Sequence, residues 1–173
     1  KNQELAQEVN NAFAFIEQSY KRFRFNHLLV SPLTARRRIY SLIDHETQQA
    51  KLGNRAEITI KVNNLVDPGI EQRIYKASQA GVKIKMIVRG MCSVIPGLAG
   101  VSDNIKIISI VDQFLEHPRV MYFYNSGQKL VYISSADWMT RNLDQRVEVA
   151  CPIYDAVLKR RIMHTLDLHF KDT

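Results

Sequence analysis

The segment from 115 to 142 contains the side chains best suited to chemistry. It brings an imidazole, a guanidinium, two hydroxyls and a carboxamide into one stretch of chain, from His117, Arg119, Ser134, Ser135 and Asn142. These groups suit the binding and transfer of a phosphoryl group better than any other common chemistry. Histidine also titrates near neutral pH, which suits it to moving a proton. We therefore predict a phosphoryl-transfer site here.

A hairpin should bring these groups together. Two runs rich in aromatic and β-branched residues, 120–125 and 129–134, flank Ser126-Gly127, which is typical of an antiparallel β-hairpin. Folding there places Pro118 roughly opposite Ser134. The imidazole and guanidinium then lie at the open end of the ribbon, beside the serines.

A simpler interpretation stands beside this one. A lone histidine before a strand is commonly a surface or capping residue, and the Ser-Ser-Ala-Asp run at 134–137 can be a turn that caps a helix. A purely structural role does not explain why so many polar groups gather at one place.

Strands and helices alternate upstream of the hairpin. We predict strands at 28–30, 57–62 and 82–88, separated by helices at 34–50 and 67–80. The first helix should bury Ile39, Leu42, Ile43 and Thr47, and Asp67-Pro68 should begin the second. This order predicts two βαβ units and a parallel core.

Four further elements and a loop complete the expected chain. An amphipathic helix should occupy 2–20 with an inward stripe of Leu5, Val9, Ala12, Phe13 and Ile16, followed by a linker. A long loop at 90–104 precedes a strand at 105–110, another strand follows at 146–150, and a helix at 154–170 closes the chain.

Ligands of such sheets bind beyond the carboxyl ends of the parallel strands. The residues expected there are Ser31, Asn63, Asn64, Arg89 and Gly90. If the second hairpin strand runs parallel to the first three strands, Ser134 reaches the same edge as Arg89. That edge should attract anions.

Composition narrows the class of protein. The 173 residues suit one domain, and a net charge of +7 favours an anionic partner. No apolar run is long enough to span a bilayer, two cysteines indicate a reducing cytoplasm, and no P-loop or Gly-x-Gly-x-x-Gly fingerprint occurs. The basic triplets 36–38 and 159–161 should form solvated helix faces, and His164 and His169 are not spaced as metal ligands.

Several motifs carry a resemblance that covers nearly the whole chain from Leu28 onward. They are Val-Asn-Asn-Leu-Val-Asp at 62–67, Ile-Val-Arg-Gly-Met-Cys at 87–92, Ser-Asp-Asn-Ile at 102–105, Ile-Val-Asp at 110–112, Phe-Leu-Glu-His at 114–117 and Ser-Ser-Ala-Asp-Trp-Met-Thr-Arg-Asn at 134–142. The chain resembles the C-terminal catalytic domain of bacterial polyphosphate kinase, and specifically the second of its two phospholipase D-like domains.

The resemblance implies an α/β fold with a phospholipase D-like mixed, largely parallel sheet flanked by helices. It also implies a boundary, with 1–26 a helix and linker from the preceding domain and 27–173 the domain itself. The family reversibly transfers the γ-phosphate of ATP to inorganic polyphosphate with Mg²⁺, through a phosphohistidine in that preceding domain, which also holds most of the Mg²⁺ site. His117 matches the family's second active-site histidine, and Arg89 matches a contact to nucleotide phosphates.

This sequence departs from the phospholipase D pattern His-x-Lys-x-x-x-x-Asp followed by Gly-Ser-x-Asn. Arg119 stands at the lysine position, Tyr124 at the aspartate position, and Ser134-Ser135-Ala136-Asp137 replaces the second motif. Loss of the aspartate makes phosphodiester hydrolysis less plausible, and the added permanent cation fits a substrate with many phosphate charges.

We therefore predict part of an ATP–polyphosphate phosphotransferase, with His117 as the catalytic residue and no metal ligand. The predicted ATP/ADP- and phosphate-binding residues are Arg89, His117, Arg119, Lys61, Asn63, Ser134, Ser135, Arg141 and Asn142. Expected partners are polyphosphate, ATP, the preceding domain and further copies of the full-length enzyme, without nucleic acid. The expected location is the cytoplasm, with peripheral membrane association left open, and the isolated chain should be inactive. The alternatives are a non-catalytic polyanion-binding domain and a phospholipase D-like phosphodiesterase.

Overall fold

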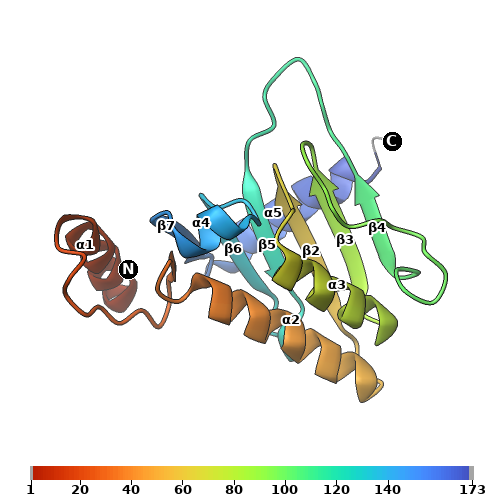
Figure 1. Cartoon of the computed structure of the whole chain (residues 1–173), viewed down its shortest axis with the longest axis horizontal. Coiled ribbons are helices and arrows are strands. Elements are labelled where there is room, and N and C mark those ends of the chain that lie inside the picture. Colours follow the sequence, from red (N-terminus) through yellow and green to blue (C-terminus); the bar gives the residue numbers. More distant parts are fainter. Residues whose placement is uncertain (1, 172–173) are drawn as a thin grey trace.

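In the computed structural model, which describes residues 2–171, the chain forms one seven-stranded sheet with helices on both faces (Figure 1). The helices are α1 (Gln3–Glu17), α2 (Ala35–Lys51), α3 (Pro68–Gln79), α4 (Thr140–Asp144) and α5 (Ala156–His169), with a 3₁₀ turn at Asn125–Gly127. The strands are β1 (Leu29–Ser31), β2 (Glu57–Val62), β3 (Lys83–Val88), β4 (Ile105–Ile108), β5 (Arg119–Phe123), β6 (Leu130–Ser134) and β7 (Glu148–Pro152).

The pairing of the strands corrects one prediction. The order is β1-β7-β6-β5-β2-β3-β4, and only β2/β3 and β3/β4 pair in parallel. The other four ladders are antiparallel, so the mixed sheet is not largely parallel in its pairing. β1 does not form a βαβ unit with β2, because β5, β6 and β7 lie between them.

The direction of the strands nevertheless supports the predicted convergence. Followed through the ladders, β1, β2, β3, β4 and β6 all run the same way, and β5 and β7 run against them. The carboxyl ends of the five strands that run the same way therefore meet at one edge of the sheet, as the prediction for Ser134 and Arg89 requires. Arg119 pairs with Ser134 in the hairpin, one residue from the predicted register.

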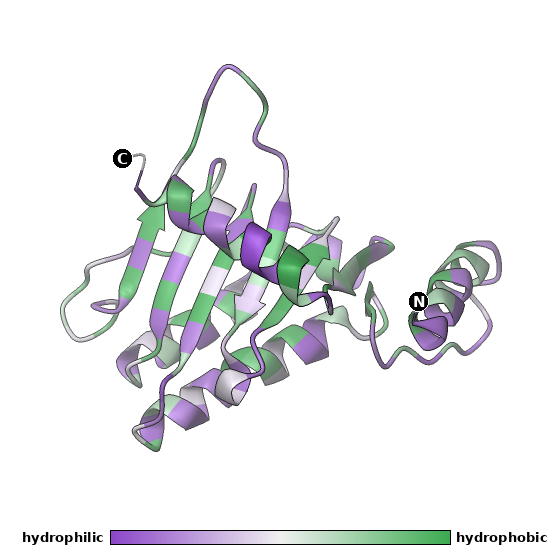
Figure 2. Ribbon diagram, turned by 180° about the vertical axis from the view of Figure 1, so that it is seen from behind, coloured by the Kyte–Doolittle hydropathy of each residue, from purple (hydrophilic) through white to green (hydrophobic). Residues whose placement is uncertain are grey.

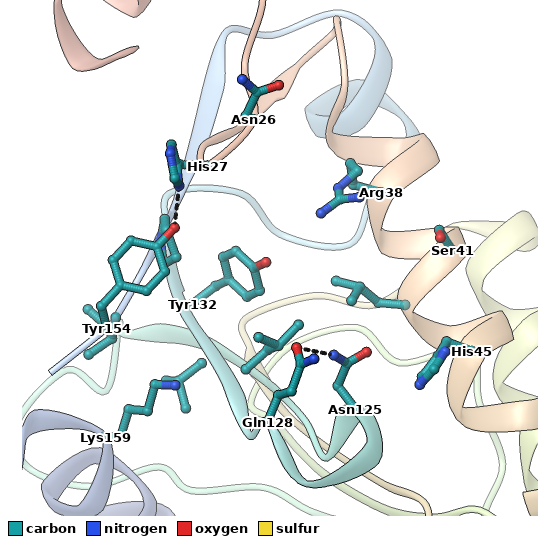
Figure 3. Close-up of a pocket in the computed structure, with 15 residues that line it drawn as sticks. Asn26, His27, Arg38, Ser41, His45, Asn125, Gln128, Tyr132, Tyr154 and Lys159 are labelled. Carbon is teal, nitrogen blue, oxygen red and sulfur yellow. Dashed lines mark hydrogen bonds between the residues drawn. The ribbon is translucent and has the colours of Figure 1, made fainter. Parts of the chain in front are cut away.

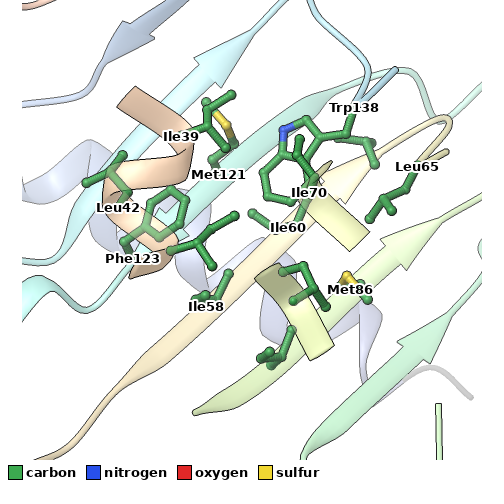
Figure 4. Close-up of a cluster of buried hydrophobic side chains, with 14 of the residues drawn as sticks. Ile39, Leu42, Ile58, Ile60, Leu65, Ile70, Met86, Met121, Phe123 and Trp138 are labelled. Carbon is green, nitrogen blue, oxygen red and sulfur yellow. The ribbon is translucent and has the colours of Figure 1, made fainter. Parts of the chain in front are cut away.

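Two apolar cores hold α2, α3 and α5 to the sheet. The larger core packs α2 and α3 on one face, where Ile58 and Ile60 of β2 meet Ile39 of α2 and Ile70 of α3 (Figure 4). The side chains predicted to face inward from α2 are all buried. On the other face α5 packs mainly through Leu166 in a smaller core (Figure 2).

The N-terminal helix joins the domain through a third apolar cluster, in which Ala12 and Phe15 pack on Leu28 and Val30, and through the carboxylate of Glu8. Glu8 accepts hydrogen bonds from the backbone N–H groups of Asn26, His27 and Leu28, at 2.6–3.2 Å, and thereby fixes α1 against the entrance to β1. The predicted apolar stripe is partly wrong. Val9, Phe13 and Ile16 are 38%, 66% and 60% exposed, whereas Ala12 and Phe15 are buried. The buried face is rotated relative to the predicted stripe, because Glu8, Ala12 and Phe15 are the residues that contact the segment entering β1.

Two long loops leave the carboxyl edge of the sheet. Residues 89–104 connect β3 to β4 without a helix or ladder, as predicted, and residues 109–118 rise from β4 to the start of β5 (Figure 1). The second loop ends beside the predicted catalytic histidine. No helix within residues 2–171 has the length and apolar character needed to cross a bilayer.

Candidate functional site

His117 stands at the carboxyl edge with its neighbours on both sides held by ion pairs. Glu116 accepts from the Lys61 ammonium at 2.5 Å, and Arg119 Nε donates to Asp137 Oδ1 at 2.8 Å. The imidazole between these pairs is exposed. The loop is therefore fixed next to His117, while the ring stays accessible.

The Asp137 carboxylate organises the hairpin side of the site. It is buried and accepts from the backbone N–H of Asn63 at 2.8 Å, from Asn64 Nδ2 at 3.0 Å and from Arg119. Burial raises the pKa of this carboxyl, but the hydrogen bonds from Arg119 and the two asparagines outweigh it and lower the pKa below its ordinary value. Asp137 thus joins the end of β2 to the end of β6.

Lys61 has a different environment from the one predicted. Its side chain is only 5% exposed, and the ammonium lies 3.5 Å from His169 Nε2 as well as against Glu116. The hydrogen bond from Lys61 lowers the pKa of Glu116, against a smaller effect of burial. Because this cation is buried and paired, Lys61 anchors the loop before His117 and does not reach out to a chain of phosphates. Glu116 and His169 were not predicted in this role.

Arg89 lies at the same edge, held by an amide. Its Nε donates to Asn63 Oδ1 at 2.5 Å, and within residues 2–171 its two Nη groups have no hydrogen-bond partner. Gly90 permits this arrangement, since a Cβ there would stand 2.9 Å from the backbone oxygen of Asn63 and 2.5 Å from Asn64 Oδ1. The asparagines are thus shared, with Asn63 joining Arg89 to Asp137.

The predicted hydroxyl and carboxamide ligands have internal partners. Ser134 Oγ accepts from the N–H of Ala136 at 3.0 Å. Ser135 Oγ donates to Glu148, and Asn142 Nδ2 donates to the other oxygen of the same carboxylate at 2.7 Å. These contacts fix the turn between β6 and α4. Arg141 is exposed on α4.

A second ion-pair cluster supports that turn from behind. Arg36 binds both oxygens of the buried Asp67, at 2.9 and 2.7 Å, and also reaches Asp144 of α4. Thr140 donates to Asp67 at 2.8 Å. The prediction that the first basic triplet forms a solvated face is therefore wrong for Arg36. Trp138 is 1% exposed and packs in the larger core.

Tyr124, at the aspartate position of the phospholipase D pattern, is remote from the histidine. It follows β5 at the opposite end of that strand, where Arg55 stacks on its ring at 4.8 Å. No group of three histidine, cysteine, aspartate or glutamate side chains within residues 2–171 is placed to hold a metal ion. Glu116 and Asp137 are engaged by cations, so we assign no step of the chemistry to a metal on this chain.

The arrangement can position an imidazole and attract phosphate oxygens. Arginine only donates, so the 3.4 Å contact from Arg119 Nη1 to His117 Nδ1 makes that nitrogen the acceptor. Nε2 is then the nitrogen that carries the proton of the neutral ring. Arg89 supplies further donors at the same edge of the sheet.

Comparison with known proteins gives consistent results. The family described as polyphosphate kinase C-terminal domain 2 matches residues 28–173. The polyphosphate kinase of Vibrio parahaemolyticus is 59% identical over 172 residues, which is 99% of this chain and 25% of that protein. The polyphosphate kinase of Escherichia coli K12 is 52% identical over 169 residues. The chain thus spans about a quarter of the length of these relatives.

Solved structures agree with the sequence matches. The crystal structure of polyphosphate kinase from Porphyromonas gingivalis superposes with a TM-score of 0.93 at 38% identity, over 98% of this chain and 26% of that one. NucT from Helicobacter pylori gives a TM-score of 0.61 at 16% identity, over 83% of this chain and 94% of that one. A phospholipase D family member, Nuc from Salmonella typhimurium, gives the same score and identity, so the phospholipase D-like fold is confirmed.

Proposed function

Because the chain belongs to the polyphosphate kinase C-terminal domain family, we propose that it forms one half of the active site of a polyphosphate kinase. The full-length enzyme reversibly transfers the γ-phosphate of ATP to inorganic polyphosphate, through a phosphohistidine in a preceding domain. This chain supplies the second active-site histidine and contacts to the phosphates. Residues 1–26 connect it to that preceding domain, and the 173-residue chain by itself is inactive.

The placement of His117 carries the proposal. The ring is exposed, while Glu116 and Arg119 on its two sides are tied to strand β2 and to the β6–α4 turn. Catalytic groups need a fixed position and an accessible reactive atom, and this arrangement supplies both. A residue with only a packing role has no need of an open face.

The proton on Nε2 gives His117 a role in transfer. In polyphosphate synthesis the N–P bond of the phosphohistidine breaks as a terminal polyphosphate oxygen forms the new O–P bond. His117 Nε2–H donates a hydrogen bond to the oxygens of the moving phosphoryl group or exchanges a proton with the attacking phosphate. Either action stabilises charge that develops during transfer.

The cations divide into two kinds. Arg89, whose Nη groups have no partner within residues 2–171, is the proposed contact to ATP or polyphosphate oxygens, and the exposed Arg141 is a second one. Arg119 and Lys61 are positioning residues, because both are paired with carboxylates and little exposed. Mg²⁺ neutralises phosphate charge in this family's reaction, and the preceding domain is its proposed holder.

The test is made on a full-length polyphosphate kinase that carries this domain. His117→Ala is compared with His164→Ala, which removes the same group from an exposed position on α5. Transfer of labelled γ-phosphate from ATP is scored separately as phosphoenzyme and as polymer. We expect loss of polymer in the first variant and ordinary synthesis in the second.

The amounts of phosphoenzyme and of polymer show at which transfer step His117 acts. Phosphoenzyme without polymer places His117 in the second transfer, as acid or base, and loss of both products places it in ATP handling or the first transfer. Near-normal synthesis by His117→Ala means that the histidine is structural. The domain would then be a non-catalytic polyanion-binding module, and the proposed role of the histidine would be wrong.

A further inference from the structure

A basic groove lies along α5, at the opposite edge of the sheet from His117. Its volume is about 810 Å³, and it is formed by the amino ends of β2 and β3, the β5–β6 turn and the first turns of α5. The charged residues that line it are six cations, Arg55, Lys83, Lys85, Lys129, Lys159 and Arg160, and two acids, Glu57 and Asp167. Such an excess of positive charge in a concave surface attracts anions.

Two of these cations are neutralised by the two acids. Arg55 pairs with Glu57 at 2.8 Å, and Lys85 lies 3.6 Å from Asp167. Within residues 2–171 the other four lining cations have no carboxylate within 4.0 Å. Unpaired cations gathered in a groove have no evident structural purpose, which points to an anionic ligand.

A second cavity continues the groove toward α2. It has a volume of about 380 Å³ and shares Lys159, Gln128 and Tyr154 with the first. Arg38 of α2 and Lys159 of α5 both line it, and Figure 3 shows their side chains with Tyr132 between them. The cations therefore follow an elongated path from α5 around to α2, which suits a chain-like anion better than a single phosphate ion.

We propose that this continuous groove is an accessory binding site for a linear chain of phosphoryl groups, separate from the site of transfer. The ligand class rests on the proposed function, whereas the charge and shape of the groove do not. The groove lining extends along β2 to Thr59, three residue steps before Val62, so about 10 Å separate the near end of the groove from the edge that bears His117. A long polymer held here stays attached to the domain between successive transfers.

The lining favours polyphosphate over single-stranded nucleic acid. Proteins that hold single strands stack successive bases on exposed aromatic rings. Of the three tyrosines in the two cavities, Tyr122 and Tyr132 are 5% exposed, and Tyr154 alone is accessible at 50%. The groove thus offers cations for phosphates but no row of rings for bases.

Binding to the 173-residue chain provides the test. Lys83, Lys129 and Arg160 are exposed, and a triple variant replaces each with Gln. The matched control replaces Lys21, Arg22 and Lys51, which are exposed cations outside both cavities, so that the same net charge is lost. Titration calorimetry measures the affinity for long-chain polyphosphate, and thermal unfolding verifies that both variants fold.

We expect the groove variant to bind polyphosphate roughly tenfold more weakly than the unsubstituted chain, with a shallower dependence on salt, and the control to change little. An equal loss in both variants, or none in either, would overturn the proposal, because net charge rather than the groove would then govern binding. A single-stranded oligonucleotide bound as tightly as polyphosphate and with the same loss would make the ligand a nucleic acid. If the triple variant unfolds, Arg160→Gln alone is used, with Arg22→Gln as its control.

Kinetics of the full-length enzyme separate this inference from the proposed function. The groove variant should form phosphoenzyme from ATP normally, while its KM for long polyphosphate rises and its KM for short chains does not. Substitution of His117 instead affects transfer to chains of every length. A negative result for one experiment therefore leaves the other intact.

Discussion

Replacing Asp137 with Asn should destabilise the domain, because every group around this carboxylate is a donor. Arg119 Nε at 2.8 Å, the N–H of Asn63 at 2.8 Å and Asn64 Nδ2 at 3.0 Å all point at its two oxygens. An amide keeps the shape but offers one acceptor oxygen and one NH₂ group. The NH₂ group must face a donor, and the Arg119 cation loses its counter-charge.

The size of the loss in the free energy of unfolding follows from the burial of the two side chains. The side chains of Asp137 and Arg119 are 9% and 14% exposed, so water replaces little of what is lost. A charge-assisted hydrogen bond contributes about 1.5–3 kcal/mol, and an unsatisfied buried donor costs about 1–3 kcal/mol. Breaking a buried ion pair from one side costs about 3–5 kcal/mol in other proteins. We expect a loss of about 3 kcal/mol, which lowers Tm by roughly 6–12 °C for a chain of this length.

The chain contains its own reporter for this measurement. Trp138 is the one tryptophan in the sequence, is 1% exposed and adjoins the substituted residue. Urea unfolding is followed by its fluorescence and by far-ultraviolet circular dichroism, which must give the same midpoint if unfolding is two-state.

Asp167→Asn is the matched control. It removes the same charge from an ion pair with Lys85 at 3.6 Å, in which both side chains are about half exposed. Such a surface pair contributes less than about 1 kcal/mol. If Asp137→Asn costs no more than Asp167→Asn, the buried network does not hold the site together and our explanation of its rigidity is wrong.

Two further predictions concern packing and protonation. Gly90→Ala should cost about 1–3 kcal/mol in urea unfolding, since its Cβ would press on the backbone oxygen of Asn63; a loss below about 0.5 kcal/mol would show that the loop yields freely. Glu46 is buried and accepts from two backbone N–H groups, and burial raises its pKa above the ordinary 4.5. The folded state therefore holds the proton of the Glu46 carboxyl more tightly than the unfolded state does. The free energy of unfolding of the wild type, relative to that of Glu46→Gln, should be constant below pH 4.5 and fall as pH rises above it. Unfolding at pH 4 and pH 7.5 tests this, and a relative stability that rises with pH contradicts it.

Elements with a strong local pattern could be predicted from the sequence. The apolar periodicity of α2, the Asp67 cap of α3 and the two hairpin strands are encoded in neighbouring residues, and each is found within a residue or two of its predicted place. The position of β1 could not be predicted, because pairing with β7 joins residues more than 100 positions apart. The short helix α4 was foreseen only in the simpler interpretation of residues 134–137 as a helix-capping turn, and its bounds could not be predicted because five residues carry too little periodicity.

Some features of the candidate site could likewise be predicted from the sequence, and others could not. Convergence of Arg89, Asn63 and Ser134 follows from strand direction alone, so it was predictable. The partners of Lys61 and Arg119 were not, because the loop before His117 determines whether a carboxylate reaches them. Sequence supplies the charge of a side chain, but burial and pairing decide whether that charge faces a ligand.

The pairing of charges also bears on how a polyanion reaches this domain. Around His117 the cations Lys61 and Arg119 are paired with Glu116 and Asp137, so that Arg89 and Arg141 are left to meet a ligand at the edge where transfer is proposed. The groove along α5 has six cations for two acids. The His117 edge thus offers a few cations held in fixed geometry, whereas the groove offers a larger excess of positive charge. If the proposed function and the proposed groove are both correct, a polymer held in the groove stays near the domain between transfers while the fixed edge at His117 directs the chemistry, so weakening the groove should lower the length of polymer made in each binding event without abolishing transfer.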